Sequence, residues 1–385
     1  MTLKLYDDNS HLETFTALVQ QCSKSGSFYS VVLDQTAFFP EGGGQYADTG
    51  KLGTATVLDV QIRDGVIYHT VDAPLKVGSE VTGTLDWDKR FRRMQSHSGE
   101  HIVSGLIHNL YGYDNIGFHL GDDDVTCDYN GLLTQEQVRE VERRANAAVF
   151  ANLDIYCDYP APALLSKMSY RSKLDLTEDV RIVTIPGIDV CACCAPHVSK
   201  TGEIGLIKIV GLEKSHGGIR LHLRCGWNAL EDYVEKQTGV LKVMDLTSTR
   251  QYEIGEGVEL LLKQNGALSH ELSVTRRKLA EAKLEALSFR EGNLTFCLEE
   301  ADTDTLRALA NGGKDKCSGM FVALTETAPD TYRYMITATD LPLSKLAREL
   351  NAALNGRGGG KDNMIQGSFA CPLHVIEDYF SEHNW

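Results

Sequence analysis

The sequence is organised around His97-Ser98-Gly99-Glu100-His101, in which two histidines are four residues apart. On a helix, residues with this spacing lie on one face, so both imidazoles can point at one ion. A second stretch, Cys193-Cys194-Ala195-Pro196-His197, places a cysteine and a histidine at the same spacing. Imidazole and thiolate together suit zinc better than calcium or magnesium. The two stretches predict one zinc site, although a buried histidine is often only a hydrogen-bonded core residue.

The second stretch is predicted to be a loop, because Gly187 and Pro196 lie around it. Such a loop can close onto a metal from another element. Spacing alone leaves the cysteine ligand open, because Cys191, Cys193 and Cys194 are near neighbours in the sequence.

Length and composition predict a soluble protein of two or three domains, since the chain has 385 residues. No apolar run reaches the about 18 residues of a membrane span. The N-terminus lacks the pattern of a signal peptide. With ten cysteines and no export signal, we expect a reducing, cytoplasmic compartment. The net charge of -15 argues against indiscriminate nucleic-acid binding. Basic residues in 89–93 and 208–224 are either a local basic patch or a solvated face.

Residues 1–90 are predicted to form a small β-barrel domain. Strand-like runs at 28–33, 55–60 and 65–71 are separated by turn residues, a spacing typical of small barrels. Gly42-Gly43-Gly44-Gln45 lies between the first two runs. Three glycines let the backbone pass close to another element or a ligand, although a flexible turn is the simpler interpretation.

Residues 91–226 are predicted to form an α+β domain that contains the zinc site. A helix from residue 90 is apolar on most sides, and a second helix begins after Thr134 with Gln137 three residues later, the pattern of a capping box. Strands are expected at 181–185, 205–210 and 219–226. Because strands and helices segregate in the sequence, the fold class is α+β.

Residues 227–295 are predicted to be a helical linker whose apolar seam alternates steps of three and four, as in a coiled coil. The seam fits a hairpin within one chain or a homodimer. Residues 296–385 are predicted to be a C-terminal α/β domain with strands at 320–324 and 332–338 and a helix at 343–354. The next stretch, Asn355-Gly356-Arg357-Gly358-Gly359-Gly360-Lys361, is expected to be a loop that presents backbone N–H groups to phosphate, or a mobile surface loop.

Three motifs in order resemble one family. His97-x3-His101 with Cys193-x3-His197, followed by residues 201–205, resembles the editing domain of alanyl-tRNA synthetase, which the free-standing AlaX proteins share. Residues 34–45 resemble the glycine-rich motif of the barrel that precedes it. Residues 355–367 resemble the C-terminal domain of the synthetase. The resemblance covers nearly the whole chain, and without an aminoacylation domain it is closest to the long form of AlaX.

The resemblance implies a cytoplasmic trans-editing hydrolase. Such an enzyme removes a wrongly attached amino acid, most often serine, from tRNA(Ala) by zinc-dependent ester hydrolysis. It implies one zinc ion per chain and picks Cys193 as the cysteine ligand. If all four ligands bind tightly, no position stays open and the ion is structural. The implied ligands are His97, His101, Cys193 and His197.

Two residues are candidates for catalysis. Glu100 stands where the family usually has threonine, and it is either a base or ligand beside the metal or points away from it. The family's substrate-facing glutamine has no clear counterpart near Asn115. Gln45, in the glycine-rich motif, is expected to line the cleft. The candidate tRNA-binding residues are Arg92, Arg93, Arg357, Gly358, Gly359, Gly360 and Lys361.

Two other classes of function compete with a tRNA(Ala) deacylase. One is a zinc-stabilised tRNA-binding module without catalysis. The other is a hydrolase of the same fold that acts on another aminoacyl ester or amide. A DHH-type phosphoesterase is disfavoured, because the sequence contains no Asp-His-His triplet.

Overall fold

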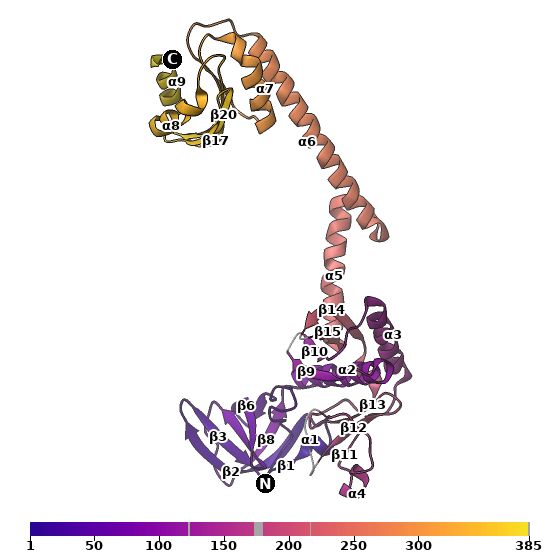
Figure 1. The fold of residues 1–385 in the computed structure, drawn as a ribbon. Coiled ribbons are helices and arrows are strands. Elements are labelled where there is room, and N and C mark those ends of the chain that lie inside the picture. The colour runs from indigo at the N-terminus through magenta and orange to yellow at the C-terminus, as the bar shows by residue number, and fades with distance from the viewer. Residues whose placement is uncertain (122–123, 173–179, 216, 384–385) are drawn as a thin grey trace. The chain divides into compact units, whose positions relative to one another are not determined.

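Helices and several separate sheets make up the computed structural model, so the predicted α+β class is confirmed (Figure 1). The structure describes residues 1–121, 124–172, 180–215 and 217–383. Two compact units divide the chain, Met1–Val240 and Leu241–Trp385, and each is described by itself. The finer division into four domains stays a prediction. Among the described residues, no helix is both long and apolar enough to cross a membrane.

The first unit begins with six antiparallel strands that close into a barrel. Strand β7 shows the alternation of a strand with one face in the core: Ile67, His69 and Val71 are buried, while the residues between them are partly exposed. Strand β1 and helix α1 precede the barrel, and β1 pairs in parallel with β4, which follows β3 in the chain. In barrel order the strands are β2 Thr14–Ser25, β3 Phe28–Leu33, β7 Val66–Val71, β6 Ala55–Arg63, β5 Gly50–Leu52 and β8 Glu80–Leu85; the flanking elements are β1 Leu3–Lys4, α1 Leu5–Asp8 and β4 Gln35–Thr36.

The rest of this unit is built around the long helix α2, Trp87–Tyr111, whose core side is almost wholly buried. The helix α2 contacts α3, β9, β13 and β15. Helix α3, Gln135–Ala151, begins with the predicted capping box, in which the Thr134 and Gln137 side chains each bond the other's backbone N–H. The remaining elements are β9 Asn115–Leu120, β10 Val125–Tyr129, β11 Tyr156–Asp158, α4 Pro162–Leu165, β12 Ile182–Ile185, β13 Asp189–Ala192, β14 Ile207–Ser215, β15 Gly218–Cys225 and α5 Gly226–Thr247, whose last residues belong to the second unit.

Arg90, in the first turn of α2, connects this helix to the barrel. Its side chain is only 1% exposed. The guanidinium forms an ion pair with Asp48 and donates to the backbone oxygens of Ala37 (2.6 Å) and Ser10 (3.2 Å). The buried guanidinium of Arg90 therefore joins the start of α2 to residues of the barrel region through an ion pair and hydrogen bonds.

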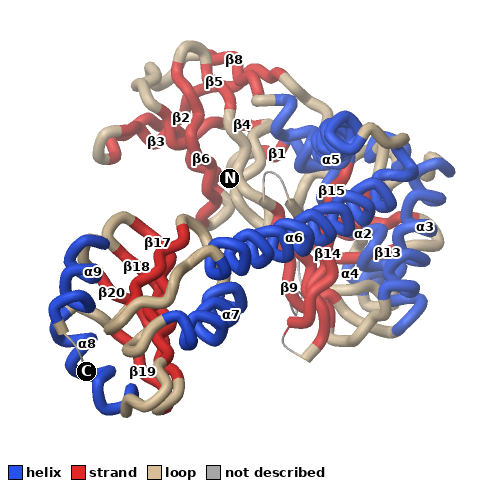
Figure 2. The backbone as a smooth tube through the Cα atoms, turned by 90° about the horizontal axis from the view of Figure 1, so that it is seen from above, coloured by secondary structure: helices blue, strands red, loops and turns tan. Residues whose placement is uncertain are grey.

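The second unit holds a five-stranded sheet in the order β16-β17-β18-β20-β19, with helices on both faces (Figure 2). One face is covered by α8 and α9, and the other packs against α7 and the end of α6. Strand β16 was not expected from the sequence. The elements are α6 Ile254–Glu285, β16 Leu294–Leu298, α7 Thr303–Gly313, β17 Phe321–Ala328, β18 Thr331–Thr337, α8 Leu343–Ala353, β19 Arg357–Lys361, β20 Met364–Ala370 and α9 Leu373–Glu382.

The prediction of a glycine-rich loop at 355–361 is wrong, because Arg357–Lys361 is the edge strand β19. It pairs with β20 along its whole length, with Gly359 opposite Gln366. Glycine is needed for this pairing: at Gly358 a Cβ would lie 2.5 Å from the Tyr334 hydroxyl. The backbone is thus engaged in the sheet on one side, and the charged ends of the strand remain exposed.

The predicted coiled-coil seam lies on α6. Leu261, Leu268, Leu272 and Leu279 are between 48% and 65% exposed. Towards its end the helix is buried instead, where Ala280 and Leu284 pack against α7. Pairing of the seam as a coiled coil stays a prediction.

Candidate metal centre

The four predicted ligands, His97, His101, Cys193 and His197, come together in the first unit, with one ligand atom of each within 4.8 Å of the others. The Cys193 Sγ lies 3.5 Å from His97 Nε2 and 3.4 Å from His197 Nε2. All three imidazoles are buried. This group could hold a single metal ion, and three neutral imidazoles with one thiolate are borderline-soft donors.

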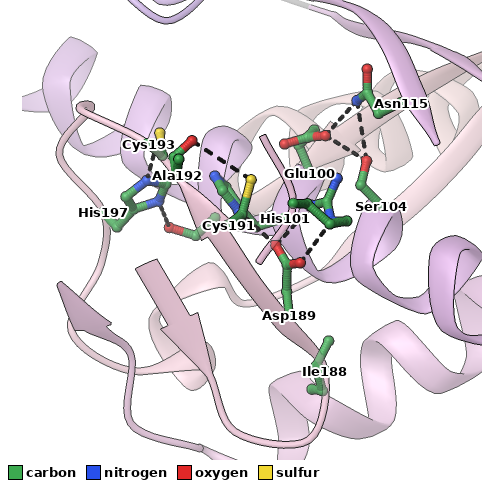
Figure 3. Close-up of polar contacts among 12 residues, drawn as sticks. Glu100, His101, Ser104, Asn115, Ile188, Asp189, Cys191, Ala192, Cys193 and His197 are labelled. Carbon is green, nitrogen blue, oxygen red and sulfur yellow. Dashed lines mark hydrogen bonds and ion pairs between the residues drawn. The ribbon is translucent and has the colours of Figure 1, made fainter. Parts of the chain in front are cut away.

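Two elements carry these ligands. His97 and His101 lie one turn apart on α2, and the cysteine stretch forms the loop after β13. Figure 3 shows His101, Cys193 and His197 of this cluster. Gly105 allows the approach of the chain that leads into β13, because a Cβ there would lie only 2.5 Å from the Ile188 carbonyl oxygen. A larger residue at this helix position would push the loop away from the histidines.

Side chains outside the cluster fix two imidazoles on α2. The Nδ1 of His97 donates to Gln45 Oε1 at 3.0 Å, and the Nδ1 of His101 donates to Asp189 Oδ2 at 2.8 Å. With Nδ1 protonated and held, each ring offers Nε2 as its metal-binding atom. Gln45 is therefore placed as a residue that orients a ligand.

The third imidazole and the Asp189 carboxylate are held in the same way. The Nδ1 of His197 is hydrogen-bonded to Ser98 Oγ at 3.1 Å. Asp189 also receives both Nε and Nη2 of Arg171, each at 2.8 Å (Figure 3 shows Asp189 beside His101). This arrangement of ligand, carboxylate and arginine is typical of a preorganised metal site.

The electrostatics favour the metal-binding forms of two ligands. Burial disfavours the Cys193 thiolate, but His97, His197 and hydrogen bonds from His101 and His197 outweigh it, so the pKa of Cys193 falls well below its usual value. Burial lowers the pKa of His197 to about 3, so this imidazole is neutral. Burial also opposes charge on His101, but its hydrogen bonds to Asp189 and the nearby thiols raise its pKa overall. Ion binding would then release a proton from His101.

The three cysteines that sequence spacing left open are now distinguished. Only Cys193 lies with the three histidines in the described structure. Cys191 groups instead with His101 and Asp189. Cys194 is exposed and faces the glycine-rich turn, since a Cβ on Gly43 would lie 3.4 Å from its sulfur.

Glu100 belongs to neither of these groups. Its carboxylate accepts hydrogen bonds from Ser104 Oγ at 2.5 Å and from Asn115 Nδ2 at 2.6 Å (Figure 3). These two hydrogen bonds hold the Glu100 carboxylate, and the role of Glu100 as base or ligand stays a prediction. Nothing in the sequence pattern predicts Asn115 as the partner of Glu100.

The arginines predicted to bind tRNA through this helix are engaged within the chain. Arg92 pairs with Glu231 at 2.7 Å and with Asp88 at 3.0 Å. Arg93 is only 6% exposed, donates to the Ala47 carbonyl at 2.7 Å and lies over the Tyr46 ring. Both guanidinium groups are therefore engaged by groups of this chain, and these two arginines do not form an open basic patch. The other five candidates, Arg357, Gly358, Gly359, Gly360 and Lys361, lie on β19 in the second unit.

Three residues that hold the ligands were not found from the sequence: Ser98, Arg171 and Asp189. The only local signal was the position of Ser98 inside the histidine stretch and of Asp189 just before the cysteines. Neither position follows a spacing rule that marks a ligand's partner.

Comparisons with known proteins support the family resemblance. The family described as "tRNA synthetases class II (A)" matches residues 4–89, and "Threonyl and Alanyl tRNA synthetase second additional domain" matches residues 180–222. The chain is 28% identical over 396 residues to "Alanyl-tRNA editing protein AlaX-L" of Pyrococcus horikoshii, covering 98% of this chain and 97% of that protein.

Ligases are also similar to the chain. It is 28% identical to alanine--tRNA ligase of Methanopyrus kandleri and 33% identical to that of Halobacterium salinarum, covering 99% and 88% of this chain. It spans only 44% and 39% of those ligases. The solved C-Ala domain of Aquifex aeolicus alanyl-tRNA synthetase matches 24% of this chain and 89% of that domain at 19% identity, but a TM-score of 0.20 is too low to support a shared fold. The resemblance that the motifs predict is nevertheless confirmed, and the chain is a homologue of the long-form AlaX protein and of part of alanine--tRNA ligase.

Proposed function

We propose that this chain is a zinc-dependent aminoacyl-tRNA deacylase that removes serine from mischarged tRNA(Ala). The observation that carries the proposal is the cluster of three imidazoles around Cys193 Sγ, each with its Nδ1 held by another side chain. Three nitrogen donors and one thiolate suit zinc. The similarity to a protein named as an alanyl-tRNA editing protein supports the substrate.

The chemical need for such an enzyme follows from the limits of binding. A site that accepts alanine cannot strongly reject an amino acid that adds one hydroxyl group, so a second, hydrolytic site is needed. In hydrolysis the water oxygen bonds to the acyl carbon, the ester C–O bond breaks, and the ribose oxygen leaves with a proton. A bound zinc ion supplies Lewis-acid polarisation or activates water. Gln45, Asp189 and Ser98 keep the ligand rings in place for this chemistry.

One observation favours a second candidate function. Four side chains converge on one point, and a zinc ion with four tight protein ligands has no open position. Under this reading the ion is structural and the chain is a tRNA-binding module without catalysis. A hydrolase for another aminoacyl ester remains the third candidate, because Glu100 gives the region a carboxylate.

The test is hydrolysis of seryl-, glycyl- and alanyl-tRNA(Ala) by the full chain, before and after zinc is removed and restored. We expect seryl-tRNA(Ala) to be hydrolysed well above its uncatalysed rate, with activity lost on zinc removal and regained with zinc but not magnesium. Alanyl-tRNA(Ala) is expected to survive.

Each alternative gives a different result in this assay. Stoichiometric zinc with no hydrolysis of any ester would identify the binding module. Preference for an ester other than seryl would identify the third candidate. Hydrolysis that persists after complete zinc removal would contradict a zinc-dependent enzyme.

We further propose that β19 contacts tRNA through its exposed ends. Replacing Arg357 and Lys361 by alanine is expected to weaken tRNA binding and to reduce the salt dependence by about 1–2 in log–log slope, because each phosphate contact contributes about one unit. Binding is measured at several salt concentrations. The matched control replaces Lys242 and Arg250, two exposed residues outside the sheet. Equal effects of the two double variants would show that only net charge matters.

A further inference from the structure

The side-chain amide of Gln45 is buried beside the metal cluster and uses only one of its two polar atoms. Gln45 is 1% exposed, and its Oε1 lies 3.0 Å from His97 Nδ1. Among the residues that the structure describes, none accepts a hydrogen bond from its Nε2. A buried N–H donor without an acceptor costs free energy, so its position next to the metal centre needs a physical reason.

The orientation of this amide follows from the chemistry of the cluster. A metal ion takes the lone pair of the ring nitrogen Nε2 of His97, so the ring carries its proton on Nδ1 and needs an acceptor there. The carbonyl oxygen of Gln45 is that acceptor, whereas the reversed amide would set its NH2 group against the N–H of the ring. Metal binding therefore leaves the Gln45 NH2 group unused and keeps it close to a ligand.

The turn that carries Gln45 fixes its backbone. The Gln45 N–H donates to the Gly42 carbonyl at 3.0 Å, and the Gly42 N–H donates to the Gln45 carbonyl at 3.1 Å. Between them, Gly43 and Gly44 have φ angles of 59° and 80°. A Cβ on Gly44 would lie 2.5 Å from the Phe118 ring, so only a bare backbone can come this close to β9. A donor held in this way is preorganised, because little has to move when an acceptor arrives.

An oxygen of the substrate is the acceptor that fits this position. Gln45 lies between the exposed residues Gly44 and Tyr46, so its side chain reaches from an exposed turn to the cluster. An aminoacyl ester at the metal centre brings an acyl oxygen, which can only accept hydrogen bonds. Negative charge grows on this oxygen when water bonds to the acyl carbon. A fixed N–H donor therefore stabilises the transition state more than the bound ester.

We propose that the Gln45 side chain has two functions: Oε1 holds His97, and Nε2 donates a hydrogen bond to the acyl oxygen of the aminoacyl ester. When the water oxygen bonds to the acyl carbon, the carbonyl π electrons move onto the acyl oxygen that Nε2 binds. They return when the ester C–O bond breaks and the ribose oxygen leaves with a proton. Gln45 is thus a catalytic residue. This inference rests on the proposed deacylase function.

Two substitutions separate the two functions. Gln45→Glu keeps an oxygen for His97 but has no N–H donor when ionised, and Gln45→Met removes both polar atoms at similar size. We expect Gln45→Glu to bind zinc as tightly as the wild type, and Gln45→Met to bind it about 10–100-fold more weakly. With each protein saturated with zinc, single-turnover hydrolysis of seryl-tRNA(Ala) should be about 100–1,000-fold slower in both variants.

A second measurement does not depend on turnover. A phosphonate analogue of seryl-adenosine carries a charged oxygen in place of the acyl oxygen, and the corresponding amide carries an uncharged one. In calorimetry with the zinc-saturated chain, Gln45→Met should bind the phosphonate about 10–100-fold more weakly and the amide only about threefold more weakly.

The matched control is Gln61→Met on β6. Gln61 donates to Glu41 at 3.1 Å and to Asp59 at 3.2 Å, outside the metal centre. This variant should keep the zinc affinity, the rate of hydrolysis and both analogue affinities of the wild type.

Four results would overturn the inference. Wild-type rates in Gln45→Glu would show that holding His97 is the whole function of Gln45. Recovery of the wild-type rate in zinc-saturated Gln45→Met would show that the donor is dispensable. Equal losses of affinity for the phosphonate and the amide would show that the amide group does not distinguish the transition state. A zinc-loaded wild type that leaves seryl-tRNA(Ala) intact would overturn the deacylase proposal itself.

Discussion

Cys193→Ala is expected to lower bound zinc from one ion per chain to almost none and to reduce deacylation by about a hundredfold or more. Residues that only support metal ligands already give effects of about 10–100-fold in affinity or activity, and a ligand should matter at least as much. The sulfur of Cys193 lies between two imidazole nitrogens, so its removal opens the centre of the cluster. Zinc content and single-turnover deacylation are measured on the same preparations.

The neighbouring cysteines provide matched controls for this experiment. Cys194→Ala removes an exposed thiol one residue away and should keep both zinc and activity. Cys191→Ala should also retain zinc, because Cys191 lies with Asp189 and not with all three histidines. Loss of zinc in Cys191→Ala with retention in Cys193→Ala would assign the thiolate ligand to Cys191.

Arg90→Met is expected to lower the free energy of unfolding of the first unit by about 3–5 kcal/mol. Removing one partner of a buried ion pair leaves the other charge, here Asp48, buried and unpaired. The Ala37 carbonyl would also lose its donor. For a unit of this size the melting temperature should fall by roughly 6–20 °C. Thermal and denaturant unfolding followed by circular dichroism measure the change.

The surface arginine Arg143 provides the control for Arg90. Its side chain is 69% exposed and pairs with Glu140 on the same helix. Arg143→Met should change stability by about 1 kcal/mol or less, because exposed ion pairs contribute little. If the two substitutions cost the same, the Arg90 pair is not an important contact between the barrel and α2.

Local pattern was enough to place the ligands on their elements. The spacing of His97 and His101 required only a helix, and the capping box at Thr134 and Gln137 follows from four consecutive residues. The strand at 28–33 was predicted with its observed bounds because its residues are aromatic and β-branched. These features depend on neighbours within one turn or one strand.

Long-range contacts could not be read from the sequence. Gln45 reaches His97 across 52 positions, and Asp189 reaches His101 across 88. Arg92 meets its acidic partner Glu231 139 positions later, so this arginine of the predicted basic patch is paired within the chain. No spacing rule connects residues this far apart.

The glycine-rich stretch 355–361 shows a different limit. Glycine is a poor strand former by itself, so composition indicates a loop. Pairing with β20 overrides that preference, and the close approach of Gly358 to Gln366 and Tyr334 excludes larger residues. Glycine occurs at position 358 because the neighbouring strand and the Tyr334 side chain leave no space for a Cβ atom.

Cys193 packs against both hydrophobic cores of the first unit, that of the barrel and that of α2. Ser10, just ahead of the barrel, donates to the His197 carbonyl at 2.7 Å, and Gln45 holds His97. Folding of the two parts is therefore thermodynamically linked to ion binding. An ion that binds only the native state adds about 4 kcal/mol at a free concentration a thousand times its Kd. Ion binding therefore also stabilises the folded barrel, although none of the four ligands belongs to the barrel.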